Sequence, residues 1–273
     1  MLREPLPRGI SPRTARHGKG RGGVKPDFIY LPHKEAPSLA YTIGGRDKLF
    51  SIRFFLRGPL LNKAAGNPSS SREFLQHILP SAAPLIAPRQ VHGRTILSAP
   101  AGGFLPERRE GDGVFLDESG VEGALRFADC FPVVLFSEIP EPWILLLHSG
   151  FKGTVRDIAG SACEKVFSRG GRDPEKTWAW IGPGIEKTRY CRTPGEEWTD
   201  RGLEVFHPSA VDICSGKAWF DIGGQIRRQI LSAGIRDDRI CSLPFGTFGQ
   251  DRLCYSYRRG DLEGRHFLLA SLR

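Results

Sequence analysis

The 273-residue sequence has no long hydrophobic run. Its longest uninterrupted apolar stretch is residues 143–147, whereas a membrane span needs about 20 apolar residues, so a transmembrane helix is excluded. The first residues also lack the apolar core of a secretory signal peptide. We therefore expect a cytoplasmic protein with no membrane partner, whose six cysteines are free thiols in a reducing compartment.

Several cofactor-binding motifs are missing as well. No two cysteines form a CxxC pair, which excludes zinc ribbons and thioredoxin-type redox sites. No GxGxxG follows a predicted strand and no GxxxxGK[ST] occurs, so dinucleotide-binding and P-loop folds lack support. The zinc deaminase signature HxE…PCxxC is incomplete, because the HxE at residues 33–35 has no CxxC downstream.

Most of the net charge of +9 belongs to the first residues of the chain. Residues 1–26 carry seven basic residues and one acid, Glu4, or +6, which leaves +3 for residues 27–273. This tail is rich in Gly, Pro and Arg and has too few apolar residues to pack, which predicts disorder. The tail could contact RNA or an anionic surface weakly, or it could be a solvated extension with no specific role. We expect no specific nucleic-acid partner. Residues 27–273 show no repeat or long linker and are predicted to form one domain.

Hydrophobic periodicity predicts three amphipathic helices. The first begins with a capping box at residues 70–73 and ends at Pro80. The second runs from about Thr154 to the glycines at 170–171, and the third covers about 220–233.

Short apolar runs between turn residues predict strands at 113–116, 123–126, 133–136, 143–147, 178–181, 254–257 and 266–272. The irregular alternation of strands and helices predicts an α/β (α+β) single-domain sandwich, in which a mixed sheet is flanked by helices.

Two of the seven histidines stand out by their surroundings. His92 precedes a glycine, where the backbone can be approached closely. His148 ends a predicted strand and is followed by a glycine-bearing turn into the second helix. Backbone N–H groups at a helix N-terminus attract anions, and Lys152 adds a cation there. These features indicate an anion site beside His148.

Cys130 ends another predicted strand and offers two kinds of chemistry. A thiolate and two imidazoles suit Zn²⁺ or copper and leave a fourth position open for water. Alternatively, His148 could activate Cys130 as a nucleophile. The spacings from His92 to Cys130 and from Cys130 to His148 match no short metal motif, and a buried unreactive cysteine is the default.

Six motifs along residues 88–273 resemble, in order, those of the YfiH family, also called the laccase domain-containing or multicopper polyphenol oxidase family. RQVHG at 89–93 resembles KQVHG, GDGV at 111–114 resembles ADALV, and FADCFPV at 127–133 resembles TADCVPV. HSGFKG at 148–153 resembles HAGWRG, IGPGI at 181–185 resembles IGPAIG, and YSYRR at 255–259, followed by Gly264-Arg265, resembles FSYRRDG followed by TGR.

The resemblance implies a YfiH-like fold, a zinc site made by His92, Cys130 and His148, and chemistry on a purine nucleoside and phosphate. The implied reactions are phosphorolysis of adenosine, inosine, guanosine and methylthioadenosine, with some adenosine deamination. Zn²⁺ is the implied cofactor, and copper is the alternative.

The same resemblance suggests roles for further residues of the motifs. Asp112, Asp129 and Lys152 are candidate catalytic groups, and Asp129 could equally orient a ligand histidine. The candidate substrate- or phosphate-binding residues are Gln90, Tyr190, Arg258 and Arg259. The two arginines could instead pair with nearby acids in a structural turn.

Three other functions remain as alternatives. A copper-dependent polyphenol oxidase is disfavoured because seven histidines with no HxH pair are too few for a multicopper centre. A Cys130/His148 thiol hydrolase or amidase would keep its turnover after chelation of metal. A non-enzymatic or RNA-binding protein would depend on the basic tail.

Overall fold

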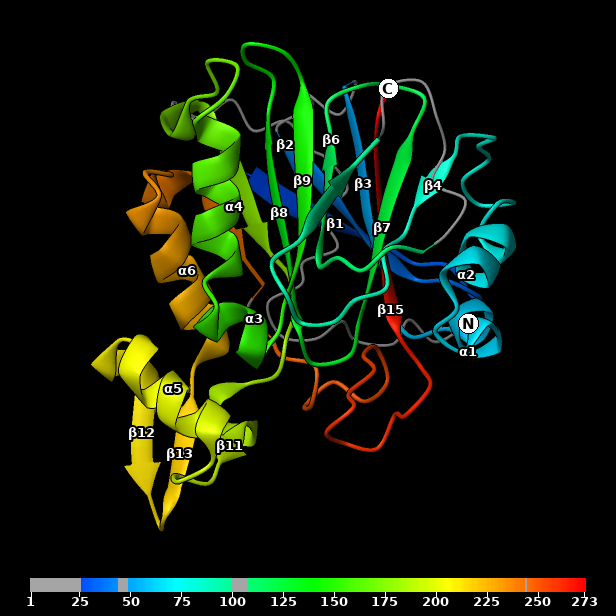
Figure 1. Ribbon diagram of the computed structural model, residues 1–273. Helices are drawn as coiled ribbons and strands as arrows, with labels where there is room; N and C mark the ends of the chain where they lie inside the picture. The colour runs from blue at the N-terminus through cyan, green and yellow to red at the C-terminus, as the bar shows by residue number, and fades with distance from the viewer. Residues whose placement is uncertain (1–25, 44–48, 100–107, 244) are drawn as a thin grey trace, which may run out of the picture.

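The computed structural model describes residues 26–43, 49–99, 108–243 and 245–273. In these residues two six-stranded sheets pack face to face and helices cover their outer faces (Figure 1). The predicted sandwich with flanking helices is therefore confirmed. The predicted basic tail lies outside the described residues, apart from Pro26.

The first sheet joins the beginning and the end of the chain. Its order is β1 (Pro26–Leu31), β2 (Ser38–Ile43), β3 (Phe50–Phe55), β15 (His266–Leu272), β7 (Glu122–Phe127) and β4 (Leu85–Ile86). All neighbours are antiparallel except the short β4, which runs parallel to β7.

The second sheet has the order β14 (Ile240–Ser242), β10 (Trp178–Ile181), β8 (Phe131–Ser137), β9 (Trp143–Ser149), β6 (Gly113–Leu116) and β5 (Ile96–Ser98). Its two edge pairs, β14–β10 and β5–β6, are parallel, and the central pairs are antiparallel. A small third sheet, β11 (Cys191–Arg192), β13 (Lys217–Phe220) and β12 (Val211–Cys214), projects beyond the sandwich in Figure 1.

Helices close the two outer faces. α1 (Pro59–Ala64) and α2 (Pro68–Phe74) cover the first sheet, whereas α3 (Phe151–Val155), α4 (Ile158–Phe167) and α6 (Ile222–Ser232) cover the second. α5 (Glu197–Val205) packs against α3. Short 3₁₀ turns lie at Pro174–Lys176, Lys187–Arg189, Pro208–Ala210 and Asp237–Arg239. Within the described ranges, no helix has the length and apolar character that a membrane crossing requires.

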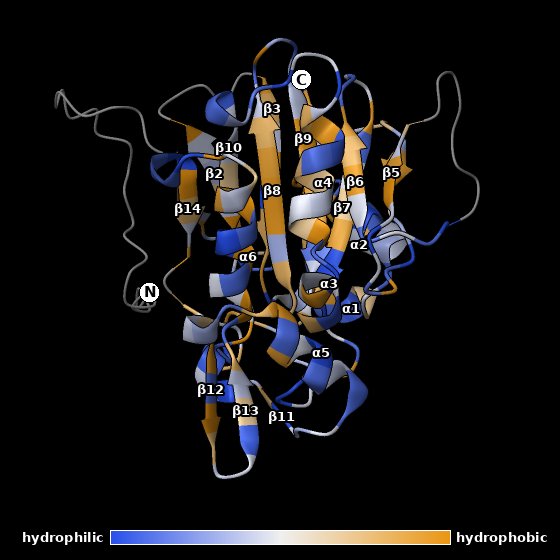
Figure 2. Ribbon diagram, turned by 60° about the vertical axis from the view of Figure 1, so that its left-hand side comes forward, coloured by the Kyte–Doolittle hydropathy of each residue, from blue (hydrophilic) through white to orange (hydrophobic). Residues whose placement is uncertain are grey.

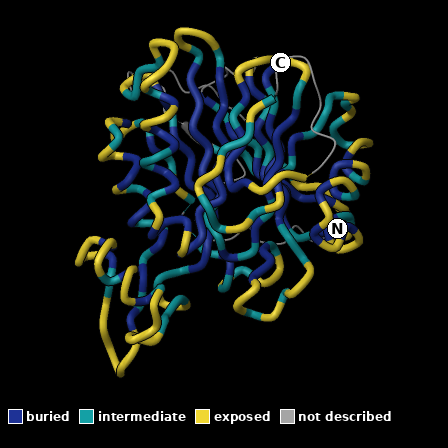
Figure 3. Tube along the Cα trace, in the orientation of Figure 1, coloured by how far each residue is buried: buried dark blue, intermediate teal, exposed yellow. Residues whose placement is uncertain are grey.

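The longest apolar run of the sequence, residues 143–147, forms most of strand β9, which is buried on both faces. Ile144 and Leu146 point into the core between the sheets, and Leu145 and Leu147 pack against the helices on the other side. Successive strand residues face opposite ways, so a strand covered on both faces must be apolar throughout. Figure 2 shows this concentration of hydrophobic residues in the central strands, and Figure 3 shows the same strands buried.

Six of the seven predicted strands are confirmed, and the helix predictions need two corrections. The capping box at residues 70–73 is wrong: α2 begins earlier, because the side chain of Asn67 accepts the Ser70 N–H and caps it. The predicted second helix is divided into α3 and α4 at Asp157, which adopts a positive φ and caps α4 by accepting the Gly160 N–H.

The predicted strand at 254–257 is wrong, because side chains take the N–H groups that a strand partner would need. The Tyr255 N–H donates to Nε2 of His266, and the Ser256 N–H donates to Asp261. The segment is therefore a fixed loop rather than a strand, and it leads into Arg258 and Arg259.

His266 makes the stability of this region depend on pH. Its Nδ1 lies 3.2 Å from the Phe127 carbonyl and its Nε2 accepts the Tyr255 N–H, so the neutral ring uses both nitrogens. Burial lowers its pKa to about 3. The unfolded chain, with a histidine pKa near 6.5, binds the proton that the folded protein excludes. The stability that His266 contributes is thus complete above pH 6.5 and is lost as the pH falls from there toward 3.

Lowering the pH from 7 to 5 should cost the protein about 2 kcal/mol of unfolding free energy through His266 alone. Denaturant titrations at the two pH values should show this loss, and it should be absent in His266→Gln. The exposed His77 provides the matched control, since His77→Gln should keep the full loss. An equal pH dependence in wild type and His266→Gln would contradict the assignment.

Candidate active site

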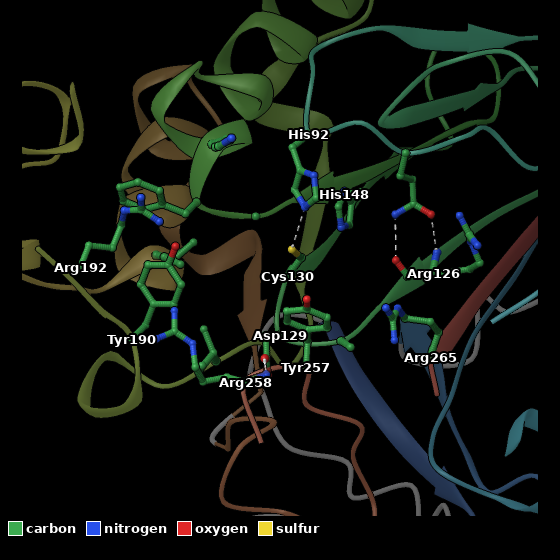
Figure 4. Close-up of a pocket in the computed structure, with 17 residues that line it drawn as sticks. His92, Arg126, Asp129, Cys130, His148, Tyr190, Arg192, Tyr257, Arg258 and Arg265 are labelled. Atoms are coloured by element: carbon green, nitrogen blue, oxygen red, sulfur yellow. Dashed lines mark hydrogen bonds between the residues drawn. The ribbon is translucent and has the colours of Figure 1, made fainter. Parts of the chain in front are cut away.

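A cavity of about 600 Å³ opens where β8 begins and β9 ends. Figure 4 shows its labelled side chains around His92, Cys130 and His148. Its volume falls in the range of about 300–1,000 Å³ that small-molecule sites occupy. The lining residues are Gln90, His92, Arg126, Ala128, Asp129, Cys130, His148, Gly150, Phe151, Lys152, Ile185, Tyr190, Arg192, Ile222, Tyr257, Arg258 and Arg265.

Three separate segments bring His92, Cys130 and His148 together, as the resemblance predicts. His92 lies in a loop and adopts a positive φ, Cys130 lies in the turn between β7 and β8, and His148 lies in β9. Their donor atoms all lie within 4.8 Å of one another. The distance from His92 Nε2 to Cys130 Sγ is 3.7 Å. A tetrahedral zinc with Zn–N and Zn–S distances of about 2.1 and 2.3 Å needs donors about 3.5 Å apart, so the three residues fit such an ion.

Asp112 fixes His92 and His148 from the side away from the cavity. Its side chain is fully buried and accepts the main-chain N–H groups of Val91, His92 and Gly93. The same carboxylate lies 2.9 Å from Nδ1 of His148. This bond leaves Nε2 of His148 free to face Cys130 and a metal. Asp112 does not line the cavity, so its position suits orienting His148 rather than acid–base catalysis.

The Cys130 thiol and the His148 imidazole shift each other's pKa. Burial alone would raise the pKa of Cys130, but His148 and His92 outweigh it and lower the pKa to about 6. Burial alone would lower the pKa of His148, but the Cys130 thiolate and Asp112 outweigh it and raise the pKa to about 9. The arrangement therefore favours a thiolate, which is the form that binds metal ions or acts as a nucleophile.

Gly150 leaves the space that Cys130 occupies. A Cβ at this position would lie 2.4 Å from Sγ of Cys130 and 3.1 Å from Cδ2 of His92. Its φ of −90° is open to any residue, so the requirement for glycine is steric. Gly150, which belongs to the turn beside His148, therefore makes room for the donor cluster.

Asp129 connects the cluster to two other loops. Its carboxylate accepts the hydroxyl of Thr247 and the main-chain N–H of Arg258, each at 2.7 Å. It lines the cavity, but both oxygens are already engaged. Orienting a ligand histidine was one of the two roles considered for Asp129, and in the structure it is Asp112 that lies against His148.

The other predicted site residues divide into two groups. Gln90, Tyr190, Lys152 and Arg258 line the cavity, and Lys152 is exposed at its mouth with Nζ 5.0 Å from the Trp198 ring. Arg259 does not line it. Its guanidinium donates to the carbonyls of Thr247, Phe248 and Cys254 and pairs with Asp261, which is the structural alternative considered for it.

Sequence reasoning missed four polar or charged side chains that line the cavity. These residues are Arg126, Arg192, Tyr257 and Arg265. Arg126 gives a signal in hindsight, because it is a cation that follows the apolar residues Ala124 and Leu125 of β7 directly before the cysteine motif. Arg192 carries no comparable signal, since its place depends on the small third sheet.

Comparison with known proteins relates this sequence to a family. The family model described as "Multi-copper polyphenol oxidoreductase laccase" matches residues 67–273. The chain is 32% identical over 171 residues to a purine nucleoside phosphorylase of Deinococcus radiodurans, and the match covers 62% of each chain. It is 28% identical over 151 residues to the purine nucleoside phosphorylase YlmD of Bacillus subtilis, covering 54% of this chain and 53% of the other. The matches therefore span little more than half the length of these relatives.

Two crystal structures share the fold. The hypothetical protein YfiH of Bacillus licheniformis superposes with a TM-score of 0.75 at 21% identity, covering 90% of this chain and 99% of the other. YlmD of Geobacillus stearothermophilus superposes with a TM-score of 0.72 at 22% identity, covering 90% of this chain and all of the other.

Adding one methyl group at Gly150 should damage the donor cluster. In Gly150→Ala we expect zinc affinity, measured by chelator competition, to fall by about 10-fold or more, because Cys130 must move. Gly153→Ala is the matched control, since its nearest atoms would lie at 3.5 and 3.6 Å, an ordinary contact distance. Equal zinc affinity in the two variants would show that Cys130 is not a ligand.

Neutralising Asp112 should also weaken metal binding without removing a donor atom. Asp112→Asn places an amide NH₂ against donors that now share a carboxylate, so His148 loses its fixed orientation. We expect a loss of about 10- to 100-fold in zinc affinity. Asp117→Asn, at an exposed carboxylate paired with Arg172, should bind zinc like wild type. Unchanged affinity in Asp112→Asn would contradict the positioning role.

Proposed function

The chain belongs to the multi-copper polyphenol oxidoreductase laccase family, and from this premise we propose that it is a metal-dependent purine nucleoside phosphorylase. The observation that carries the proposal is the His92–Cys130–His148 cluster in a cavity lined by five cations and one carboxylate. The names of the Deinococcus and Bacillus relatives support the same reaction. Adenosine, inosine, guanosine and methylthioadenosine are the proposed substrates.

In the proposed reaction an oxygen of inorganic phosphate bonds to C1′ of the ribose while the bond from C1′ to the purine nitrogen breaks. The electron pair of that bond leaves with the purine, which takes up a proton. Negative charge is present on the phosphate and develops on the departing base. Fixed cations around the cavity can stabilise both charges, which is how preorganised sites lower such barriers.

Zinc is the proposed metal and copper the alternative, since thiolate and imidazole donors suit both. When bound, the ion would supply Lewis-acid polarisation and an activated water, and the latter would permit some deamination of adenosine. His92, Cys130 and His148 would hold it, and Asp112 would fix the orientation of His148. Tyr190 stays protonated because burial raises its pKa, so its hydroxyl can donate to a bound base.

The alternatives make different demands on the structure. A multicopper oxidase needs several metal centres, whereas the part of the chain that the structure describes holds one three-donor cluster. A thiol hydrolase would use the Cys130–His148 pair without metal, and the lowered pKa of Cys130 suits that chemistry too. Metal removal separates this hydrolase from the phosphorylase.

The test measures purine release from inosine and adenosine by the full chain, with and without inorganic phosphate. Release should require phosphate and fall more than about 100-fold in Cys130→Ala, because losing a metal ligand removes several kcal/mol of charge stabilisation. Zinc measured on the same samples should fall from about one ion per chain to near zero. The exposed Cys214 gives the control, and Cys214→Ala should behave as wild type.

Release that is equally fast without phosphate would refute phosphorolysis, and release that survives Cys130→Ala would remove the cluster from the reaction. Purine release that persists after chelation but is lost in Cys130→Ala would show that the thiol acts without metal, as the hydrolase alternative requires.

A further inference from the structure

We propose that Arg126 and Arg265 form the subsite that binds inorganic phosphate, and that the opposite wall of the cavity, around Phe151 and Tyr190, receives the purine. This inference rests on the proposed phosphorolysis and assigns the two substrates to opposite sides of the donor cluster. Figure 4 shows Arg126 and Arg265 on one side of His92, Cys130 and His148, and Tyr190, Arg192 and Arg258 on the other.

The charges that line the cavity call for an anionic ligand. Arg126, Lys152, Arg192, Arg258 and Arg265 line it, against the single carboxylate of Asp129. The oxygens of that carboxylate already accept hydrogen bonds from Thr247 and Arg258. A cleft with one sign of charge and low-dielectric walls concentrates ligands of the opposite sign.

On the Tyr190 side the two guanidiniums lie against aromatic rings. The Arg192 guanidinium pairs with Glu196 at 2.9 Å and stacks 5.0 Å from the centre of the Phe151 ring. Arg258 stacks 5.0 Å from the centre of the Tyr190 ring. Phe151 and Tyr190 contact each other with ring centres 5.5 Å apart. This wall presents flat aromatic and guanidinium surfaces, which suit a planar heterocycle.

On the other side the two guanidiniums donate hydrogen bonds to main-chain carbonyls, and that of Arg265 also lies 5.9 Å from the centre of the Tyr257 ring. Arg126 Nη1 donates to the carbonyl of Gly66 at 2.7 Å, and Arg265 Nη1 donates to the carbonyls of Gly264 and Asp261. Among the described residues, no carboxylate lies within ion-pair distance of either guanidinium. Burial and the charges of Arg108 and Arg265 lower the pKa of Arg126 to about 10. An oxyanion bound here would offset this repulsion, and planar guanidiniums match phosphate oxygens well.

Gln90 fixes Arg126 beside the donor cluster. Its side-chain amide donates to the Arg126 carbonyl at 2.8 Å and its side-chain oxygen accepts the Arg126 N–H at 3.0 Å. Gln90 thereby holds the end of β7 in the way a neighbouring strand would, two residues before His92. We therefore assign Gln90 as a positioning residue for the phosphate subsite.

The two sides also satisfy the direction of the reaction. When an incoming phosphate oxygen bonds to C1′ and the bond from C1′ to the purine breaks, the two groups lie on opposite faces of the ribose carbon. A phosphate at Arg126 and Arg265 and a purine at Tyr190 place the ribose between them, over the donor cluster. Such alignment of the reacting groups is a large part of what an active site contributes.

The test measures binding of inorganic phosphate to the zinc-loaded full chain by calorimetry, without nucleoside, and then the KM values for phosphate and inosine. Arg126→Gln should weaken phosphate binding and raise the phosphate KM by roughly 10- to 100-fold, as expected for loss of a charged hydrogen bond. Arg126→Lys, which retains the charge, should recover part of the loss. Arg192→Gln should instead raise the inosine KM and leave the phosphate affinity nearly unchanged.

Arg228→Gln is the control for loss of a positive charge away from the cavity, since Arg228 is exposed and contacts Ser209. Phosphate affinity unchanged in Arg126→Gln, or weakened by Arg192→Gln instead, would overturn the assignment. Phosphate that binds through Arg126 in a chain that does not cleave nucleosides would support the subsite while refuting the phosphorylase. A wild-type chain that binds no phosphate at millimolar concentration would refute the subsite itself.

Discussion

The buried carboxylate of Asp112 is the interaction on which the candidate site depends. It accepts three successive N–H groups from the loop that carries His92, and it also lies 2.9 Å from Nδ1 of His148. A carboxylate without water is tolerated only when such donors replace its hydration. Moving either histidine would remove hydrogen bonds from the buried Asp112 carboxylate and cost free energy. This cost keeps His92 and His148 in their positions. Two donors from distant parts of the chain are fixed by one side chain that never reaches the cavity.

In the proposed metal site in front of Asp112, a bound metal ion would take the place of a proton. Histidines lower the pKa of Cys130, and the resulting thiolate raises the pKa of His148. The positive charge that balances the thiolate can be the proton on His148 or a metal ion that displaces this proton. Metal binding to such a site is therefore coupled to proton release. Gly150 adds the steric condition, because any side chain there would occupy the place of the sulfur.

The sequence allowed the sandwich and six of the twelve strands described in its two large sheets to be predicted, because apolar runs bounded by turns reflect local constraints. The capping box at residues 70–73 failed where Asn67 competed for the helix start, and the strand at 254–257 failed where side chains took its N–H groups. The spacings within the donor cluster gave no signal, since three segments meet only after the sheets form. The family motifs supplied that information. Arg126 was missed because its role depends on where β7 ends beside Gln90.

Each side of the cavity is attached to a different member of the donor cluster. Arg126 is held by Gln90, which belongs to the same loop as His92. Arg258, on the aromatic side, is held through its N–H by Asp129, the residue directly before Cys130. Hydrogen bonds to the main chain thus position the two walls relative to the cluster. Because the backbone of Arg126 and Arg258 is fixed, only the side-chain atoms beyond it have to become ordered. Main-chain anchoring of this kind reduces the entropy lost when a ligand binds. It also explains why the walls can differ in chemistry while the distance from each wall to the cluster stays fixed: one wall carries Arg126 and Arg265, and the other carries guanidiniums stacked on Phe151 and Tyr190.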